Sequence, residues 1–346
     1  MKKSLAIIIT AISVVLIIVT IFVTRGSNKS LTVGISPYQD IAMIVNIKNL
    51  QLEKKYNTKV ELQTMNWEDI VPSIASSGKT IDIGFGSLVE YLTKSNNLNQ
   101  DSKDPLLFIY PAYIFKGGGF ITFKNEIPVI NSTNINDSAL IASFLKNKIG
   151  AQKNSLYEMI LFSLAKRNNI PAKSLKIFDT PLNDGILATQ KGSLQISSAG
   201  LTQITEALKQ KGKVVLTMED MGFADVTGFI CKKSVLEAKR KEIENLINMW
   251  YDCVDYVMTD LDKNSKYSLQ YLDEKAATKY TLEQYKTALS QEYFPRTIGE
   301  AQKEIVSLSG KYSYKRISED VADYLLVNKI VDKKPVIPEF IDSNKK

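Results

Sequence analysis

Apolar and polar positions follow one repeating pattern between residues 31 and 87. Three short runs with the length of buried strands occupy residues 31–35, 59–63 and 81–85. Two segments between them, residues 41–57 and 69–76, repeat apolar side chains at helical spacing. Strands that alternate with helices in this order pair in parallel through right-handed crossovers. The pattern therefore predicts an α/β lobe.

A second unit of the same build follows in residues 148–217. Its predicted strands occupy residues 148–151, 175–178, 193–197 and 214–217, and its predicted helices occupy residues 155–168, 183–190 and 202–210. Between the units, residues 110–123 are apolar on both sides of Gly117, Gly118 and Gly119. Because glycine adopts backbone angles that other residues resist, this segment is a candidate crossing between two lobes. A hairpin or a bulge inside one sheet is the alternative.

The remainder of the chain completes the predicted architecture. Residues 227–231 are expected to form a strand that returns to the first lobe. Residues 234–260 are expected to form one long amphipathic helix with Met249 and Trp250 in the core. The predicted fold class is therefore α/β, with two lobes around a cleft and a helical C-terminal region. The expected divisions are an N-terminal segment at 1–29, the first part of lobe 1 at 30–115, lobe 2 at 116–222, and a return to lobe 1 with C-terminal helices and a tail at 223–346.

Composition fits a packed globular protein, with 44% hydrophobic and 23% charged residues in a chain of 346. The formal charge of +7 comes from lysines that are scattered along the chain. Scattered lysines are typical of a solvated surface, whereas nucleic-acid-binding proteins gather them into a patch or a stripe. We therefore expect no nucleic-acid partner.

The chain contains no histidine. Histidine is the commonest general base near neutral pH and the commonest metal ligand, so its absence excludes Ser-His-Asp and Cys-His catalysis. The two cysteines, Cys231 and Cys253, are too few for a four-thiolate metal site and form either a disulfide or two buried thiols. The sequence therefore predicts a protein that is not an enzyme and uses no metal or cofactor.

The N-terminus carries an export signal. Lys2 and Lys3 precede an uncharged segment at residues 5–24, which ends before Arg25. About 20 apolar residues span a bilayer, whereas a cleavable signal peptide has an apolar stretch of about 7 to 15. Because the best cleavage site, at residues 24–26, is a poor one, an uncleaved anchor is favoured over a cleaved signal peptide. The charges on the two sides of the segment place the body of the protein outside the cytoplasmic membrane.

The carboxyl ends of the predicted parallel strands define the candidate ligand site, because ligands of open α/β sheets bind beyond these ends. The candidates there are Ser36, Tyr38, Trp67, Gly86 and Ser87 in lobe 1, and Asn154, Ser155, Thr180, Gly200 and Leu201 in lobe 2. The helices that follow the strands point their amino termini at this edge, where N–H groups suit an anion such as a sulfonate or a carboxylate. Ordinary helix capping is the alternative role for each hydroxyl.

Larger side chains near this edge have two interpretations. Tyr38 and Trp67 are suited to form the apolar walls of a small-molecule site, although Trp67 is equally suited to packing between elements. Lys116 and Lys153 would add positive charge to an anion site, but in a lysine-rich chain surface positions are the alternative.

Six fragments, in this order and spacing, resemble the periplasmic solute-binding proteins for sulfonates, taurine, nitrate and thiamine precursors, which serve ABC importers. The fragments are LTVGIS at 31–36, IASSGKTIDIGFGS at 74–87, KIGAQKNS at 148–155, DGILATQKGSLQI at 184–196, VTGFI at 226–230 and LVNKIV at 326–331. The resemblance covers roughly residues 31–342.

This resemblance implies a type II periplasmic-binding-protein fold whose cleft closes on the ligand. The cleft contacts that it implies are Ser36, Tyr38, Gly86, Ser87, Asn154, Ser155, Gly200, Leu201, Thr227 and Gly228. The chain departs from the family where Gln195 and residues 199–201 replace an acid and an aromatic–acid pair that many relatives carry. The wall of lobe 2 is therefore expected to be less bulky and less acidic than in the family.

The function that the resemblance implies is that of an extracytoplasmic solute-binding subunit of an ABC importer, which captures a small anionic solute by lobe closure. Expected partners are that solute, the permease and ATPase subunits, and the membrane through residues 5–24, with the protein itself a monomer on the outer face of the cytoplasmic membrane. One alternative is a membrane-tethered sensor or partner-presenting domain of the same fold. Another is an enzyme of pyrimidine-precursor metabolism.

Overall fold

The structure is a computed structural model that describes residues 30–76, 81–99, 102–276 and 279–341. The predicted signal or anchor at residues 1–29, with its membrane segment at 5–24, lies outside these ranges. Within them, no helix has the length and the apolar character needed to cross a bilayer.

Sheet A forms lobe 1 and has five strands in the order β2-β1-β3-β10-β4. Its strands are β1 (Ser30–Ile35), β2 (Lys59–Thr64), β3 (Ile83–Ser87), β4 (Leu106–Phe115) and β10 (Asp225–Lys232). As the sequence predicts, β1 pairs in parallel with β2 and β3, whereas β10 pairs antiparallel with β3 and β4. All five residues of β3 are buried, so this central strand is covered on both faces.

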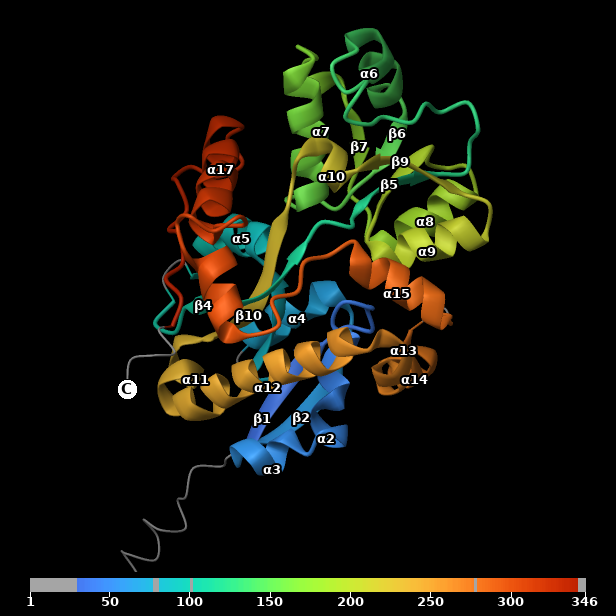
Figure 1. Cartoon of the computed structure of the whole chain (residues 1–346). Coiled ribbons are helices and arrows are strands. Elements are labelled where there is room, and N and C mark those ends of the chain that lie inside the picture. Colours follow the sequence, from blue (N-terminus) through green and yellow to red (C-terminus); the bar gives the residue numbers. More distant parts are fainter. Residues whose placement is uncertain (1–29, 77–80, 100–101, 277–278, 342–346) are drawn as a thin grey trace, which may run out of the picture.

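Sheet B forms lobe 2 and has five strands in the order β7-β6-β8-β5-β9. Its strands are β5 (Gly119–Thr122), β6 (Lys148–Gly150), β7 (Lys176–Phe178), β8 (Ile196–Ala199) and β9 (Lys213–Thr217). β6 pairs in parallel with β7 and β8, and β5 pairs antiparallel with β8 and β9. Two sheets, each packed with helices, confirm the predicted two-lobed α/β fold (Figure 1).

Helices cover both sheets (Figure 1). In lobe 2 they are α6 (Ser138–Leu145), α7 (Leu156–Arg167), η2 (Ala172–Ser174), α8 (Leu182–Gln190), α9 (Leu201–Lys209) and α10 (Met218–Met221). In lobe 1 and the C-terminal region they are η1 (Ala42–Val45), α2 (Asn46–Asn49), α3 (Leu52–Tyr56), α4 (Trp67–Ala75), α5 (Leu88–Asn99), α11 (Lys233–Ala238), α12 (Arg240–Thr259), α13 (Leu261–Asn264), α14 (Lys266–Lys275), α15 (Leu282–Ser290), α16 (Ile298–Ala301), the π-helical η3 (Gln302–Val306) and α17 (Tyr314–Val327).

The chain passes from sheet A to sheet B between β4 and β5, through the first two residues of the glycine triplet. A Cβ atom on Gly117 would lie 2.4 Å from Leu201 Cδ2 and 2.6 Å from Glu292 Oε1, so a larger residue at this crossing would displace both side chains. Glu292 accepts hydrogen bonds from the backbone N–H groups of Lys116, at 2.5 Å, and Gly117, at 3.0 Å. The triplet therefore joins two sheets, and the alternative of a hairpin or bulge inside one sheet is wrong. The chain returns to sheet A between α10 and β10.

The single helix predicted for residues 41–57 is wrong. This segment forms η1, α2 and α3, with Gln51 in a left-handed conformation (φ 52°) between the last two. The apolar spacing is misleading because Ile41, Ala42, Met43 and Ile44 are all 0% exposed. A segment that is buried on every side has no single helical face.

The single helix predicted for residues 234–260 is also divided, into α11 and α12, at Lys239. The Nζ atom of Lys239 lies 2.8 Å from Asp82 Oδ2 and donates to the carbonyl of Ser30. This pairing depends on residues far away in the sequence, so the local pattern does not reveal it.

α12 supplies much of the core of lobe 1. Trp250 is 0% exposed, donates to the carbonyl of Ala112 and packs against Phe85 with ring centroids 5.0 Å apart. Cys231 and Cys253 are both free and buried, so of the two alternatives for the cysteines, two buried thiols is confirmed. Burial raises the pKa of the Cys231 thiol to about 12, which keeps this thiol protonated and unreactive.

We expect the Trp250→Ala variant to lose about 3 to 5 kcal/mol of unfolding free energy, because it removes a large fully buried side chain and leaves a cavity. Equilibrium unfolding in urea measures the loss. Val327→Ala, at a position that is 64% exposed, is the control and should change the free energy by less than about 0.5 kcal/mol. Equal losses in the two variants would contradict this account of the core.

Candidate ligand-binding site

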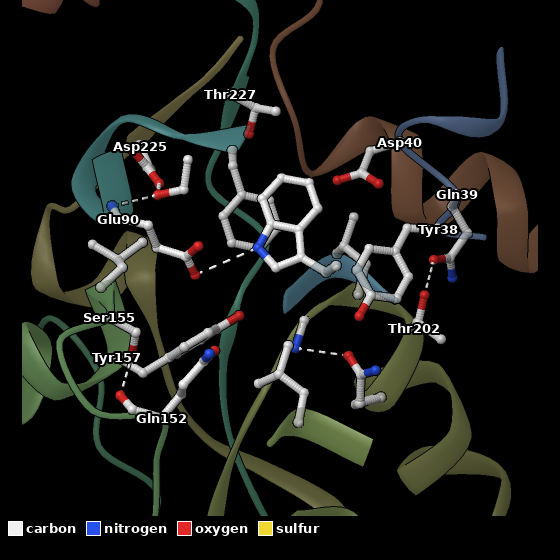
Figure 2. A pocket seen from close by; sticks show the side chains of 18 of the residues that line it. Tyr38, Gln39, Asp40, Glu90, Gln152, Ser155, Tyr157, Thr202, Asp225 and Thr227 are labelled. Carbon is white, nitrogen blue, oxygen red and sulfur yellow. Dashed lines mark hydrogen bonds between the residues drawn. The ribbon is translucent and has the colours of Figure 1, made fainter. Parts of the chain in front are cut away.

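A cavity of about 80 Å³ lies between the lobes and is lined by residues of both. It sits beyond the carboxyl ends of β1 and β3 in lobe 1 and of β6 and β8 in lobe 2, where ligands of open α/β sheets bind. Lobe 1 contributes Tyr38, Gln39, Asp40, Trp67, Ser87, Glu90, Tyr113, Phe115, Asp225 and Thr227, and lobe 2 contributes Gln152, Ser155, Leu156, Tyr157, Leu182, Gly200, Leu201, Thr202 and Gln203. Figure 2 shows how these side chains converge.

Seven of the residues predicted from the sequence lie together in this lining: Tyr38, Trp67, Ser87, Ser155, Gly200, Leu201 and Thr227. Each ends or follows a strand, or lies at the start of a helix, at the edge between the lobes, except Thr227, which lies near the start of β10. Whether they bind a ligand remains a prediction.

The other five predicted residues lie outside the lining. Ser36 uses its hydroxyl to bond the carbonyl of Met65, and Thr180 bonds the carbonyl of Phe178. A Cβ atom on Gly86 would meet Ile230, and one on Gly228 would meet Phe108, so both glycines face packed side chains. Asn154 adopts a left-handed conformation (φ 57°) in the turn before α7.

Several lining residues were not predicted, and they include all three acids and three of the five aromatic residues. Asp225 and Tyr113 were missed because they lie on β10 and β4, whose antiparallel pairing brings the start of one strand beside the end of the other. The rule that ligands bind beyond the carboxyl ends of strands applies to parallel strands only. A returning antiparallel strand, as predicted at residues 227–231, is the signal that would have pointed to Asp225.

Asp225 occupies the amino terminus of α5. Its carboxylate accepts hydrogen bonds from the Ser87 hydroxyl and, at 3.3 Å, from the backbone N–H of Val89. The side chain is 3% exposed, and burial raises its pKa to about 7 despite these hydrogen bonds. A carboxyl group with this pKa changes its charge near neutral pH.

Asp40 is a second buried acid. It accepts a hydrogen bond of 2.6 Å from the hydroxyl of Tyr113, and burial raises its pKa to about 6. Glu90, the third acid, accepts from Trp67 Nε1 at 3.4 Å and lies 3.7 Å from the Nζ atom of Lys94. The lining contains neither lysine nor arginine. In particular, neither Lys116 nor Lys153 lies in it.

Aromatic rings form much of the remaining wall. The rings of Tyr38 and Trp67 lie 6.3 Å apart at an angle of 32°. Tyr157, on α7, lies across the cavity from Tyr38 (Figure 2). Burial raises the pKa of the Tyr157 hydroxyl well above its usual value, so the group remains a neutral hydrogen-bonding partner. The cavity thus combines apolar faces with a few polar groups, as small-molecule sites do.

The two lobes touch at the rim of the cavity. Thr202 Oγ1, at the start of α9, donates to Gln39 Oε1 of lobe 1 at 2.5 Å. Gln39 is 0% exposed, and its Nε2 atom has no hydrogen-bond partner among the residues that the structure describes. A buried amide donor without a partner is costly, and a ligand acceptor inside the cavity would satisfy it.

Comparisons with known proteins establish the fold. No protein-family model and no curated protein matches the chain. Among solved structures, the periplasmic aliphatic sulphonate-binding protein SsuA from Escherichia coli matches with a TM-score of 0.65 at 13% identity, over 92% of this chain and 95% of that chain. The chain therefore has the periplasmic-binding-protein fold.

Two further structures support the same assignment. The alkanesulfonate-binding protein SsuA from Xanthomonas axonopodis pv. citri, solved with MOPS bound, matches with a TM-score of 0.65 at 12% identity, over 89% of this chain and 96% of that chain. The periplasmic nitrate-binding protein NrtA from Synechocystis matches with a TM-score of 0.58 at 13% identity, over 89% of this chain and 92% of that chain. At these identities the likeness defines the fold, and the ligand must be argued from the cavity itself.

We expect Asp225→Asn to stabilise the protein, relative to the wild type, more at pH 7.5 than at pH 5. The pKa of Asp225 is raised to about 7 in the folded protein, so the wild type loses stability as the pH rises from about 4 to about 7. The neutral amide does not titrate. The difference in unfolding free energy between variant and wild type should shift by about 2 to 3 kcal/mol between the two pH values.

Urea unfolding at both pH values measures this shift. Val327→Ala, at an exposed position on α17, changes no titratable group, so it is the control and should give a difference that does not depend on pH. A pH-independent difference for Asp225→Asn as well would show that the carboxyl group titrates normally.

Proposed function

We propose that this protein is the solute-binding subunit of an ABC importer and that it holds a compact solute between its two lobes. The observation that carries the proposal is the cavity between the lobes, which lies at the strand ends of both sheets. The likeness in fold to sulfonate- and nitrate-binding proteins supports the same class of function. The expected partners are the permease and ATPase subunits of the importer.

Lobe closure follows from the connections between the lobes. The crossing at Gly117 has no side chain, and Glu292 binds its backbone N–H groups, so rotation there is constrained to one short segment. Thr202 of lobe 2 and Gln39 of lobe 1 form a hydrogen bond between the lobes, which separation of the lobes would break. A solute that fits the closed cavity shifts the population toward this closed form, which the importer recognises.

We also propose an extracytoplasmic location for the folded body, with the segment at residues 1–29 as anchor or signal and the protein acting as a monomer. The uncharged run at 5–24 and the likeness in fold to periplasmic proteins support this location.

Binding without catalysis is the chemistry that the lining supports. Ser155 donates to the carbonyl of Gln152 and so faces no general base. Ser87 donates to the carboxylate of Asp225, but the chain has no histidine to complete a Ser-His-Asp arrangement. The lining has no cysteine or lysine nucleophile.

The structure offers one feature in favour of the anionic solute expected from the sequence and one against it. The amino terminus of α7 points at the cavity, and no side chain caps it, so its N–H groups are able to bind an anion. Against this, the cavity holds three acidic side chains and no basic one.

We expect small molecules released from natively purified residues 30–346 to include one solute in stoichiometric amount, identified by mass spectrometry. Adding that solute back at about 100 times its dissociation constant should add about 2.7 kcal/mol of stability, measured as a thermal shift. Trp67→Leu, which removes one aromatic wall, should weaken its binding about tenfold.

Tyr267→Leu, an aromatic residue that is 40% exposed and outside the cavity lining, is the control and should bind as the wild type does. The proposal fails if no solute is released and no thermal shift occurs with sulfonates, nitrate, pyrimidines, dicarboxylates or small amines.

A further inference from the structure

All the charged side chains that line the cavity are acidic, and all of them belong to lobe 1. Asp40, Glu90 and Asp225 are 5, 9 and 3% exposed, respectively. Lys94 pairs with Glu90, but in the described part of the chain neither Asp40 nor Asp225 has a cationic partner within salt-bridge distance. Their donors are hydroxyl and backbone N–H groups. Buried carboxylates are stabilised by pairing with a cation, so these two are available to a positively charged solute.

Two positions that an anion would need are already filled by the protein. The Asp225 carboxylate sits on the N–H of Val89 at the start of α5. At the start of α9, Gln203 Oε1 accepts from the N–H of Gly200 at 3.2 Å. An anion bound at either place would have to displace an internal acceptor, and at α5 it would also meet the repulsion of Asp225.

The apolar wall favours a cation as well. Five aromatic residues line the cavity: Tyr38, Trp67, Tyr113, Phe115 and Tyr157. The faces of such rings attract ammonium groups, and the attraction is stronger where water is excluded. The hydrogen bond from Trp67 Nε1 to Glu90 holds an aromatic ring beside a carboxylate. A cation at this place would be attracted both by the ring and by the carboxylate.

We infer that the solute is a compact organic ammonium ion, attracted by the carboxyl groups of Asp40, Glu90 and Asp225 and by the aromatic rings around them. This inference rests on the proposed solute-binding function and assigns the ligand class of that site. The described residues contain no cluster of three metal-ligating side chains, so the acids are not arranged around a bare metal ion. The unpartnered Nε2 atom of Gln39 adds a donor for an oxygen atom on the same solute.

The size of the cavity limits the solute. A water molecule needs about 10 to 15 Å³ of such space, so the cavity of about 80 Å³ holds on the order of five to eight non-hydrogen atoms. Small amino alcohols and their methylated forms have this size and carry both an ammonium group and an oxygen atom.

Isothermal titration of residues 30–346 with charged and neutral isosteres tests the inference. Choline is compared with 3,3-dimethylbutan-1-ol, in which carbon replaces the charged nitrogen, and 2-aminoethanol is compared with 1-propanol. 2-Hydroxyethanesulfonate is the anionic probe. At pH 7.5 at least one ammonium ion should bind about tenfold or more tightly than its neutral isostere and than the sulfonate.

The acids supply the second arm of the test. Asp225→Asn and Glu90→Gln should each reduce the preference for the ammonium ion over its isostere, while Asp320→Asn on α17 should preserve it. Two different acids are used so that one misfolded variant does not decide the result. Circular dichroism and urea unfolding establish that each variant is folded.

The pH dependence has a defined sign. Asp225 is hydrogen-bonded to Ser87 and interacts electrostatically with Glu90. Asp40 is hydrogen-bonded to Tyr113 and interacts electrostatically with Glu292 and the tyrosines at 38, 157, 280 and 285. Because burial raises the pKa of Asp40 to about 6 and that of Asp225 to about 7, both acids gain protons as the pH falls to 5.5. A cation must then displace these protons, so the affinity for the preferred ammonium ion should fall about tenfold or more from pH 7.5 to pH 5.5.

An anionic solute would show the opposite trend, with tighter binding at pH 5.5. Tighter binding of 2-hydroxyethanesulfonate, or equal binding of ammonium ions and isosteres, overturns the inference and leaves the solute-binding function standing. Absence of binding by every probe also overturns it, and the solute released from the native protein then decides separately whether the solute-binding function stands.

Discussion

The burial of carboxyl groups where the lobes meet is the constraint on which the cavity depends. Asp40 and Asp225 lie in lobe 1 with hydroxyl and N–H donors around them, and Glu292 lies at the crossing between the lobes. Burial raises the pKa of all three, that of Glu292 well above its ordinary value. Each of these groups therefore destabilises the folded protein when it is ionised, unless a cation pairs with it. A fold that closes over such groups gains stability when a cation enters.

The same groups join the elements that shape the site. Asp225, the first residue of β10, caps α5 through Val89 and Ser87, so the strand that returns from lobe 2 is tied to the helix that follows β3. Glu292 holds the backbone at Gly117, where the chain leaves lobe 1. Buried acids thus hold together the segments that connect the two lobes. We therefore expect ligand binding in the cavity to be coupled to the arrangement of the lobes.

Local patterns in the sequence predict the strands of both lobes except β4 and β5, because the spacing of apolar residues determines them. They also predict the edge where the cavity lies, because the direction of the parallel strands determines it. They fail where burial or pairing is not local: Ile41 to Ile44 are buried on all sides, and the helix predicted for residues 234–260 is divided at Lys239, which pairs with Asp82. The formal charge of +7 gives no indication of an acidic cavity, because the three acids lie far apart in the sequence and only folding brings them together. Asp225 in particular reaches the site on an antiparallel strand, which the rule for parallel sheets does not cover.

The central claim is that the cavity between the lobes is the ligand site and that its acids and aromatic rings select a cation. A crystal structure of residues 30–346, grown at pH 7.5 with a saturating amount of whichever of choline and 2-aminoethanol binds more tightly, tests it most directly. The account predicts density for that ion in the cavity, with the ammonium group against Trp67 and the carboxylates of lobe 1, and with Thr202 still bonded to Gln39. An empty or water-filled cavity beneath closed lobes, or the ion bound elsewhere alone, would contradict it.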